Sequence, residues 1–116
     1  MMPIEIYKPY DVVAVPFPFT DKQQTKRRPA VVLSSSKHQK DTDHCSLLMI
    51  TSADNKDWPS DVDILHLDAA GLSHDSVMRQ KIFTIDSRLI VRKVGRLHAG
   101  DRERLVAKLT QHLPIG

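Results

Sequence analysis

The chain has 116 residues, enough for one domain with one modest hydrophobic core. Its hydrophobic fraction of 41% and charged fraction of 27% are those of an ordinary soluble protein, and its apolar runs are too short to span a bilayer. The single cysteine, Cys45, excludes an internal disulfide framework. Because the N-terminus also lacks the apolar core of a signal peptide, we expect a cytoplasmic protein with no membrane partner.

Charge is unevenly distributed along a chain whose net charge is only +3. Residues 22–40 contain six Lys or Arg and no acid, and residues 79–108 contain nine Lys or Arg against three acids. Between them, residues 41–75 contain eight Asp and a single Lys. The two basic blocks predict a phosphate-binding face if the fold brings them together, and solvated surfaces if it does not.

Short apolar and β-branched runs predict strands over most of the chain, separated by polar loops at 20–28, 35–44 and 52–60. The prolines at 16 and 18 indicate that the first strand lies at a sheet edge or ends in a bulge. The second is apolar enough to be covered on both faces. The predicted strands are residues 11–19, 29–34, 45–51, 62–67, 76–85 and 89–97.

The last segment changes to helical periodicity, with one apolar stripe formed by Leu105, Val106, Leu109 and Leu113. Acidic residues at 101 and 103 fall in its first turn, where the helix dipole favours them. Several short strands followed by one helix predict a mainly β fold, a small twisted barrel or sheet with a helix packed on it. We expect a single domain over residues 1–116.

Three cations, Lys26, Arg27 and Arg28, precede Pro29 where a polar loop becomes an apolar strand. Proline biases the residue before it toward extended geometry, so Arg28 is expected at the strand entrance. Its planar guanidinium could bind a phosphate at two points, although an isolated Arg-Pro is more often a solvated strand end.

Metal-binding and nucleophile motifs give no signal in this sequence. It contains no CxxC, no HExxH and no glycine-rich phosphate loop, and its histidines form no recognisable pair. We therefore expect no metal site and no cofactor. Cys45 lies in an apolar run and is predicted to be a core residue rather than a nucleophile.

Arg28 stands at the start of one predicted strand, Thr51 at the end of another and Arg79 toward the start of a third. Together they could cleave RNA without a metal. In that reaction the ribose 2′-hydroxyl attacks the adjacent phosphate, and the pentacoordinate phosphorus gains negative charge. Two arginines could neutralise this charge, and the threonine hydroxyl could donate to a phosphate oxygen. The sequence alone does not bring the three residues together.

Several blocks of the sequence together resemble the MazF/PemK/Kid family, the toxin halves of bacterial toxin–antitoxin pairs. The first two read Tyr-Asp-Val-Val-Ala-Val-Pro-Phe-Pro-Phe-Thr-Asp at 10–21 and Lys-Arg-Arg-Pro-Ala-Val-Val-Leu-Ser at 26–34. The others read Ile-Thr-Ser at 50–52, Ser-Val-Met-Arg-Gln-Lys-Ile-Phe-Thr-Ile-Asp at 76–86 and Val-Gly-Arg-Leu at 94–97. They follow the family's order and cover nearly the whole chain.

This resemblance implies an SH3-like β-barrel with a C-terminal helix, assembled as a homodimer. It also implies a ribosome-independent and metal-independent endoribonuclease that cuts single-stranded RNA at short sequences. The products would be a 2′,3′-cyclic phosphate or 3′-phosphate and a 5′-hydroxyl. A cognate antitoxin would cover the site with a partly disordered acidic tail, and the toxin–antitoxin complex would bind DNA.

Carried over by position, Arg28, Thr51 and Arg79 match the family's catalytic residues. The candidate RNA-binding residues are Lys22, Lys26, Arg27, Ser52 and Lys81. The chain departs from the family in two places, because some Kid-type members have an acid where Lys81 stands and some carry a histidine in the loop at 20–28. Arginine stays protonated in proteins, so we expect Arg28 to act as an electrostatic clamp, and the proton acceptor stays open.

Two other functions remain open at the level of sequence. A non-catalytic member of the same fold could poison a protein target, as the related CcdB toxins do with gyrase, with Trp58-Pro59 as a binding spot or as a cover for the core edge. A basic RNA-binding module without toxicity would bind with salt-dependent affinity and would not cleave.

Overall fold

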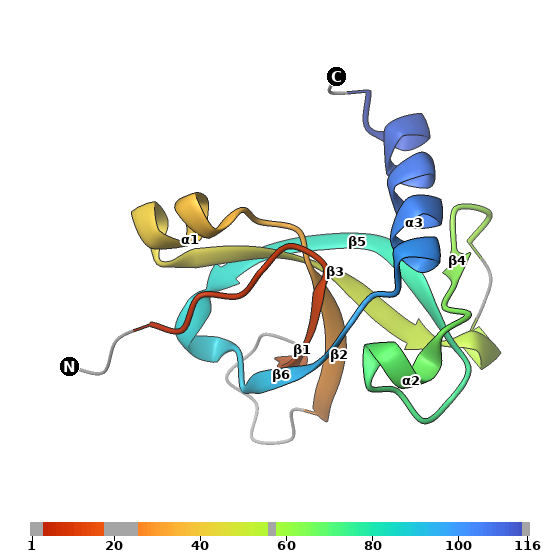
Figure 1. Cartoon of the computed structure of the whole chain (residues 1–116), viewed down its shortest axis with the longest axis horizontal. Helices are drawn as coiled ribbons and strands as arrows, with labels where there is room; N and C mark the ends of the chain where they lie inside the picture. The colour runs from red at the N-terminus through yellow and green to blue at the C-terminus, as the bar shows by residue number, and fades with distance from the viewer. Residues whose placement is uncertain (1–3, 18–25, 56–57, 115–116) are drawn as a thin grey trace.

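Six strands form one curled antiparallel sheet, and α3 and α1 lie near opposite ends of it (Figure 1). This is a computed structural model, and it describes residues 4–17, 26–55 and 58–114. The strands are β1 (Asp11–Phe17), β2 (Lys26–Val32), β3 (His44–Ser52), β4 (Val62–Asp63), β5 (Ser76–Asp86) and β6 (Arg92–Arg96). The helices are α1 (Ser36–Thr42), α2 (Leu67–Ala70) and α3 (Ala99–His112), with single 3-10 turns η1 (Ala53–Asn55) and η2 (Ser87–Leu89). The predicted mainly β fold with a C-terminal helix is confirmed.

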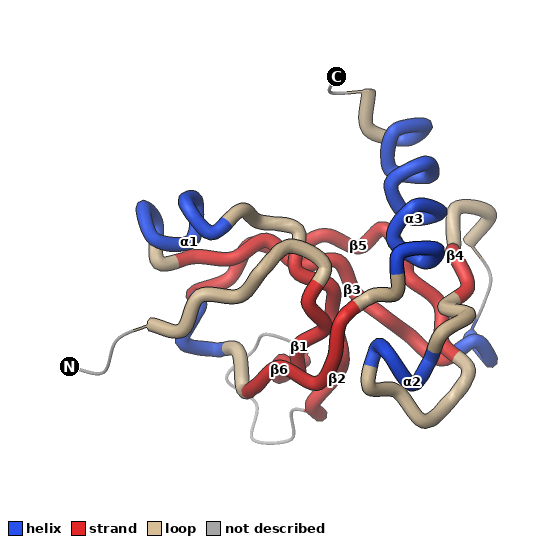
Figure 2. Tube along the Cα trace, viewed as in Figure 1, coloured by secondary structure: helices blue, strands red, loops and turns tan. Residues whose placement is uncertain are grey.

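The sheet has the order β4-β5-β3-β2-β1-β6, and every pair of neighbours is antiparallel. Alternate residues of its strands fill two separate cores because successive side chains point to opposite faces. Val12, Val31 and Leu48 belong to one core, which α2 and α3 cover with Ala70 and Leu105. The other core contains Val13, Val15, Ala30, Val32, Cys45, Leu47, Met49 and Ile85. Figure 2 shows the helices at the margins of the sheet.

The prolines of the sheet lie where a neighbouring strand is missing on one side. The sequence predicts that the first strand lies at an edge or ends in a bulge. The first half of β1 instead runs between β2 and β6, and its pairing with β6 shifts register between Val12 and Val13 rather than at the end of the strand. Pairing with β6 ends at Ala14, however, so Pro16 faces a partner only in β2. Pro29 likewise comes before Ala30, the first residue of β2 that pairs with β3. A missing N–H is tolerated at such one-sided positions. Pro18 lies outside the described residues.

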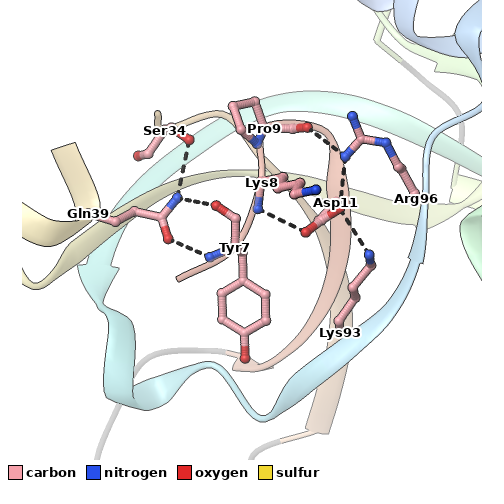
Figure 3. Close-up of polar contacts among 8 residues, drawn as sticks. All are labelled: Tyr7, Lys8, Pro9, Asp11, Ser34, Gln39, Lys93 and Arg96. Carbon is pink, nitrogen blue, oxygen red and sulfur yellow. Dashed lines mark hydrogen bonds and ion pairs between the residues drawn. The ribbon is translucent and has the colours of Figure 1, made fainter. Parts of the chain in front are cut away.

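The polar segment 35–44, predicted to be a loop, contains helix α1. Ser35 caps its N-terminus by accepting a hydrogen bond from the backbone N–H of His38. Gln39, its only buried residue, accepts from the backbone N–H of Tyr7 at 2.9 Å and donates to the carbonyl of Tyr7 at 2.7 Å (Figure 3). A short helix that buries one amide has no apolar stripe, so hydrophobic periodicity could not reveal it.

Asp11 holds the N-terminal segment against β6 (Figure 3). Its side chain is almost fully buried and accepts from the backbone N–H of Lys8 and from Arg96 at 3.0 Å, and Lys93 lies 3.3 Å away. Two cations of the second basic block are therefore used within the fold. Their charges are partly balanced by this buried carboxylate, although both side chains are about half exposed.

The predicted strand at 62–67 is shorter in the structure, where β4 spans only Val62–Asp63. The backbone N–H groups of Leu65 and His66 donate to the carboxylate of Asp101, each at 3.0 Å. Asp101 is fully buried and also pairs with Arg104. The acid expected to complement the dipole of α3 therefore ends the strand and joins it to the helix.

Helix α3 packs through Leu105 and Leu109. Val106 and Leu113, which we also assigned to its apolar stripe, are each 38% exposed. Within the part of the chain that the structure describes, no helix is long and apolar enough to span a bilayer.

Candidate functional site

Arg28 and Thr51 lie just beyond the last paired residues of β2 and β3. The last hydrogen-bonded pair of these strands is Ala30 with Met49, and continuing that register places Arg28 opposite Thr51. Directly opposite residues of antiparallel strands share a face of the sheet. The strands no longer pair at this point, so space opens between the two side chains.

Two cavities meet at these residues. The larger, about 680 Å³, is lined by Arg27, Arg28, Thr51, Ser52 and the segment 71–76, among others. The smaller, about 230 Å³, is lined by Phe17, Arg28, Met49, Ile50, Thr51, Asn55, Arg79 and Lys81. The three predicted catalytic residues therefore border one cavity, and Arg28 and Thr51 border both.

The guanidinium of Arg28 is only partly used by the fold. The side chain is half-buried, and its Cζ lies 5.9 Å from the centre of the Phe17 ring. Its Nε is buried and has no hydrogen-bond partner among the described residues. A buried donor without a partner costs free energy, so an acceptor that enters the cavity would be favoured there.

Arg79 is held by an ion pair that the sequence did not predict. Its Nε and Nη2 donate to the two carboxylate oxygens of Asp61 at 3.0 and 2.8 Å, and Nη2 also donates to the carbonyl of Asn55 at 2.6 Å. The side chain of Asp61 is fully buried, and that of Arg79 is 9% exposed. The fork geometry fixes the plane of the guanidinium beside the smaller cavity.

Trp58 lies against the cations of this cavity. The Cζ of Arg79 is 5.1 Å from the centre of a Trp58 ring, and the Nζ of Lys81 is 5.6 Å from it. Both distances fall within the range of cation–π attraction. Trp58 is half-buried, and its ring lies against two cations that border this cavity. The two roles predicted for Trp58-Pro59, a binding spot or a cover for the core edge, stay predictions.

The predicted RNA-binding residues fall into three groups. Arg27 and Ser52 line the larger cavity, and Lys81 lines the smaller. Lys26 is exposed at the start of β2 and lines neither of the two cavities. Lys22 lies outside the described residues, as does most of the loop at 20–28.

The described residues offer neither a cluster of metal ligands nor a reactive cysteine at these cavities. Among the described residues, no three His, Cys, Asp or Glu side chains are grouped to hold a metal ion. Cys45 is fully buried, which confirms it as a core residue, and burial raises the pKa of its thiol to about 11. A thiol held neutral in this way is a poor nucleophile.

Sequence reasoning missed Asp61, Asn55 and His74 at this site. His74 is exposed on the turn before β5 and lines the larger cavity with Arg28 and Thr51. Neither the segment around Asp61 nor the turn around His74 carries a sequence motif. Both reach the site only because β5 pairs with β3 and β4. Local sequence does not predict which strands pair with each other.

Solved structures with the same fold include MazF toxins, at low sequence identity. MazF from Deinococcus radiodurans in a MazE–MazF complex is 22% identical, with a TM-score of 0.76 over 97% of this chain and all of the other. The Mycobacterium tuberculosis toxin MazF-mt6 is 17% identical, with a TM-score of 0.72 over 91% of this chain and 98% of the other. A mycobacterial endoribonuclease in complex with its cognate antitoxin is 13% identical, with a TM-score of 0.72 over 96% of each chain.

No curated protein sequence matches the chain significantly. A family model does, however: the one described as PemK-like, MazF-like toxin of type II toxin–antitoxin system matches residues 8–113. This match spans almost the entire chain and includes Arg28, Thr51 and Arg79. The chain therefore belongs to the PemK-like and MazF-like toxin family of type II toxin–antitoxin systems.

Proposed function

We propose that this protein is a metal-independent endoribonuclease that cleaves single-stranded RNA at short sequences and is neutralised by a cognate antitoxin. The observation that carries the proposal is the meeting of Arg28, Thr51 and Arg79 at one cavity, with the Nε of Arg28 unpartnered among the described residues. Cationic donors at a buried edge of a cavity suit a phosphate that gains charge during reaction.

In the proposed reaction the ribose 2′-oxygen forms a bond to phosphorus and the bond from phosphorus to the 5′-oxygen breaks. Arg28 holds the phosphate and neutralises its added charge, and the Thr51 hydroxyl donates to a phosphate oxygen. Arg79, oriented by Asp61, borders the cavity from the other side. The products are a 2′,3′-cyclic phosphate and a 5′-hydroxyl.

The test is to incubate the purified toxin, freed of antitoxin, with a long single-stranded RNA in EDTA and to map the new ends. Cuts at a short recurring sequence with 5′-hydroxyl ends, and none from R28A, would support the proposal. Binding without cleavage would favour an RNA-binding module. If the folded protein neither binds nor cuts RNA, and if the R28A variant still stops cell growth, the result would favour a toxin that poisons a protein target.

The proposal includes a homodimer and an acidic segment of antitoxin over the cavities. The neighbouring solved structures include a MazE–MazF complex and an endoribonuclease with its cognate antitoxin. Arg27, Arg28 and Lys81 would attract an acidic chain to the same surface as RNA. Light scattering should give a mass near twice the 13.2 kDa of the chain, and addition of antitoxin should stop cleavage.

A further inference from the structure

Among the described residues that line the larger cavity, one has an imidazole side chain. Of its lining residues, Arg27 and Arg28 stay protonated, and Ser52, Thr51 and the other hydroxyls do not titrate in that range. The titratable groups that remain are Asp54 from η1 and the adjacent His74 and Asp75 before β5. Imidazole can both accept and donate a proton at neutral pH, whereas a carboxylate there is a poor donor.

The backbone holds His74 beside the end of β3. Ser76 pairs with Ser52 and Val77 with Thr51 in the β3–β5 ladder, so His74 lies two residues before the pair that ends this ladder. The backbone N–H of Ala53 donates to the carbonyl of Asp75 at 2.9 Å, and the Ser76 hydroxyl donates to the carbonyl of His74 at 2.8 Å. The turn is therefore tied to the end of the strand that carries Thr51.

A close approach of two glycines anchors the other end of this turn. Gly71 has a left-handed φ of +75°, and a Cβ there would lie 2.0 Å from the carbonyl oxygen of Val94 in β6. A Cβ on Gly95 would lie 2.3 Å from the backbone of Ala70. The segment that leads to His74 is thus packed against β6 without intervening side chains, and its path is restricted at both ends.

We propose that the imidazole of His74 transfers the proton during RNA cleavage at this cavity, an inference that rests on the proposed ribonuclease activity. Neutral imidazole takes the proton of the 2′-hydroxyl while the 2′-oxygen bonds to phosphorus and the bond to the 5′-oxygen breaks. The departing 5′-oxygen takes a proton from water to become the 5′-hydroxyl, and the imidazolium returns its proton to water. Arg28 and Thr51 bind the phosphate, so that each group has one task.

The charges around His74 fit this assignment. Arg27 and Arg28 approach the cavity from β2, and Asp54 and Asp75 border it from η1 and from the turn itself. The cations would hold the substrate phosphate near the ring, and the carboxylates would stabilise the imidazolium after it has taken up the proton.

The test compares wild type, H74A and H74Q on an oligonucleotide that contains one mapped cleavage site, in EDTA. We expect H74Q to lower kcat roughly a hundredfold or more and to flatten the acid side of the pH–rate profile. Imidazole added to H74A should restore part of the rate in proportion to its neutral form. H38Q removes another exposed histidine, on α1, and should leave rate and profile unchanged.

A substrate with sulfur in place of the bridging 5′-oxygen separates the two halves of proton transfer, because a thiolate leaves without protonation. A retained defect in H74Q is expected if His74 accepts the proton of the 2′-hydroxyl, and near-normal cleavage by H74Q would overturn that step. Wild-type rate and pH profile in H74Q would overturn the role of His74 and leave the ribonuclease proposal intact. Intact RNA with wild-type protein would overturn the ribonuclease proposal itself.

Discussion

Arg28 and Arg79 reach the smaller cavity from different strands, and the fold treats their guanidinium groups in opposite ways. Arg79 donates three hydrogen bonds, two to Asp61 and one to the carbonyl of Asn55, and its side chain is nearly buried. Arg28 is half-buried beside Phe17, and its Nε has no partner within the described residues.

The two arginines therefore offer different things to a ligand: Arg79 has a fixed position, and Arg28 has a charge that no acid balances in the described ion pairs. The charge of Arg79 is balanced by a carboxylate 2.8 Å away, so the pair adds little net field but a fixed geometry. The charge of Arg28 faces no acid in the described ion pairs, so it remains available to a phosphate. Substitutions at each arginine or its partner should therefore change different measured quantities.

The largest effect is expected on stability, from the partner of Arg79. D61A leaves a buried guanidinium without its carboxylate and should lower the free energy of unfolding by about 3–5 kcal/mol. Urea unfolding followed by circular dichroism measures it. D41A breaks the exposed Lys37–Asp41 ion pair and should lower the free energy of unfolding by less than about 0.5 kcal/mol. Equal losses in both variants would contradict the contrast between buried and exposed pairs.

R28A should show the reverse pattern, with stability kept and activity lost. Removing one donor to the charged transition state typically costs about 3 kcal/mol, roughly a hundredfold in kcat. The melting temperature should change little, because Arg28 makes no ion pair in the described structure. R28K keeps the charge without the planar fork and should fall between wild type and R28A. A melting temperature that falls as far as that of D61A would show Arg28 to be structural.

T51V tests the neutral donor opposite Arg28. Valine keeps the branched shape and loses the hydroxyl, so a hydrogen bond to a charged oxygen worth about 1.5–3 kcal/mol would disappear, at least tenfold in kcat. T84V serves as the matched control, because Thr84 lies toward the other end of β5 and its hydroxyl bonds Ser46. Activity of T51V equal to that of T84V would remove the hydroxyl from the mechanism.

The smallest effect is expected at Lys81, which lines the cavity but approaches Trp58 rather than an acid. If Lys81 contacts an RNA phosphate, K81Q should reduce the slope of log affinity against log salt by about 0.7. Fluorescence anisotropy with a labelled RNA, using the R28A background to prevent cleavage, gives the slope. An unchanged slope would mean that Lys81 contacts the Trp58 ring and makes no contact with an RNA phosphate.

The strands and their cores follow from local sequence, whereas the partners within the site do not. Val12, Val31 and Leu48 lie in strands that apolar β-branched runs predict, and those strands fix the register that sets Arg28 opposite Thr51. Helix α1 was missed because its one buried residue is polar, and β4 was overextended because Asp101 takes its backbone donors. These outcomes depend on contacts between residues far apart in the chain.

Asp61 and His74 show the same limit within the site. Asp61 lies in an acidic stretch where any of several aspartates could have paired with Arg79, and only the β4–β5 ladder selects it. His74 stands in a polar turn that reads as an ordinary loop, and its nearness to Thr51 appears only when β5 pairs with β3. Arg28, Thr51 and Arg79 could be proposed from the sequence, whereas the strand pairing that brings Asp61 and His74 to the cavities could not.

The place of Trp58 has a practical consequence for optical experiments. It is the sole tryptophan of the chain, so intrinsic emission excited selectively at the indole reports one location. The two cationic groups near its ring, from Arg79 and Lys81, polarise that indole. Arg79 is fixed by Asp61, so an anionic oligomer that draws Lys81 away from the ring should change the emission colour and yield. Binding could then be titrated with unlabelled protein and unlabelled RNA.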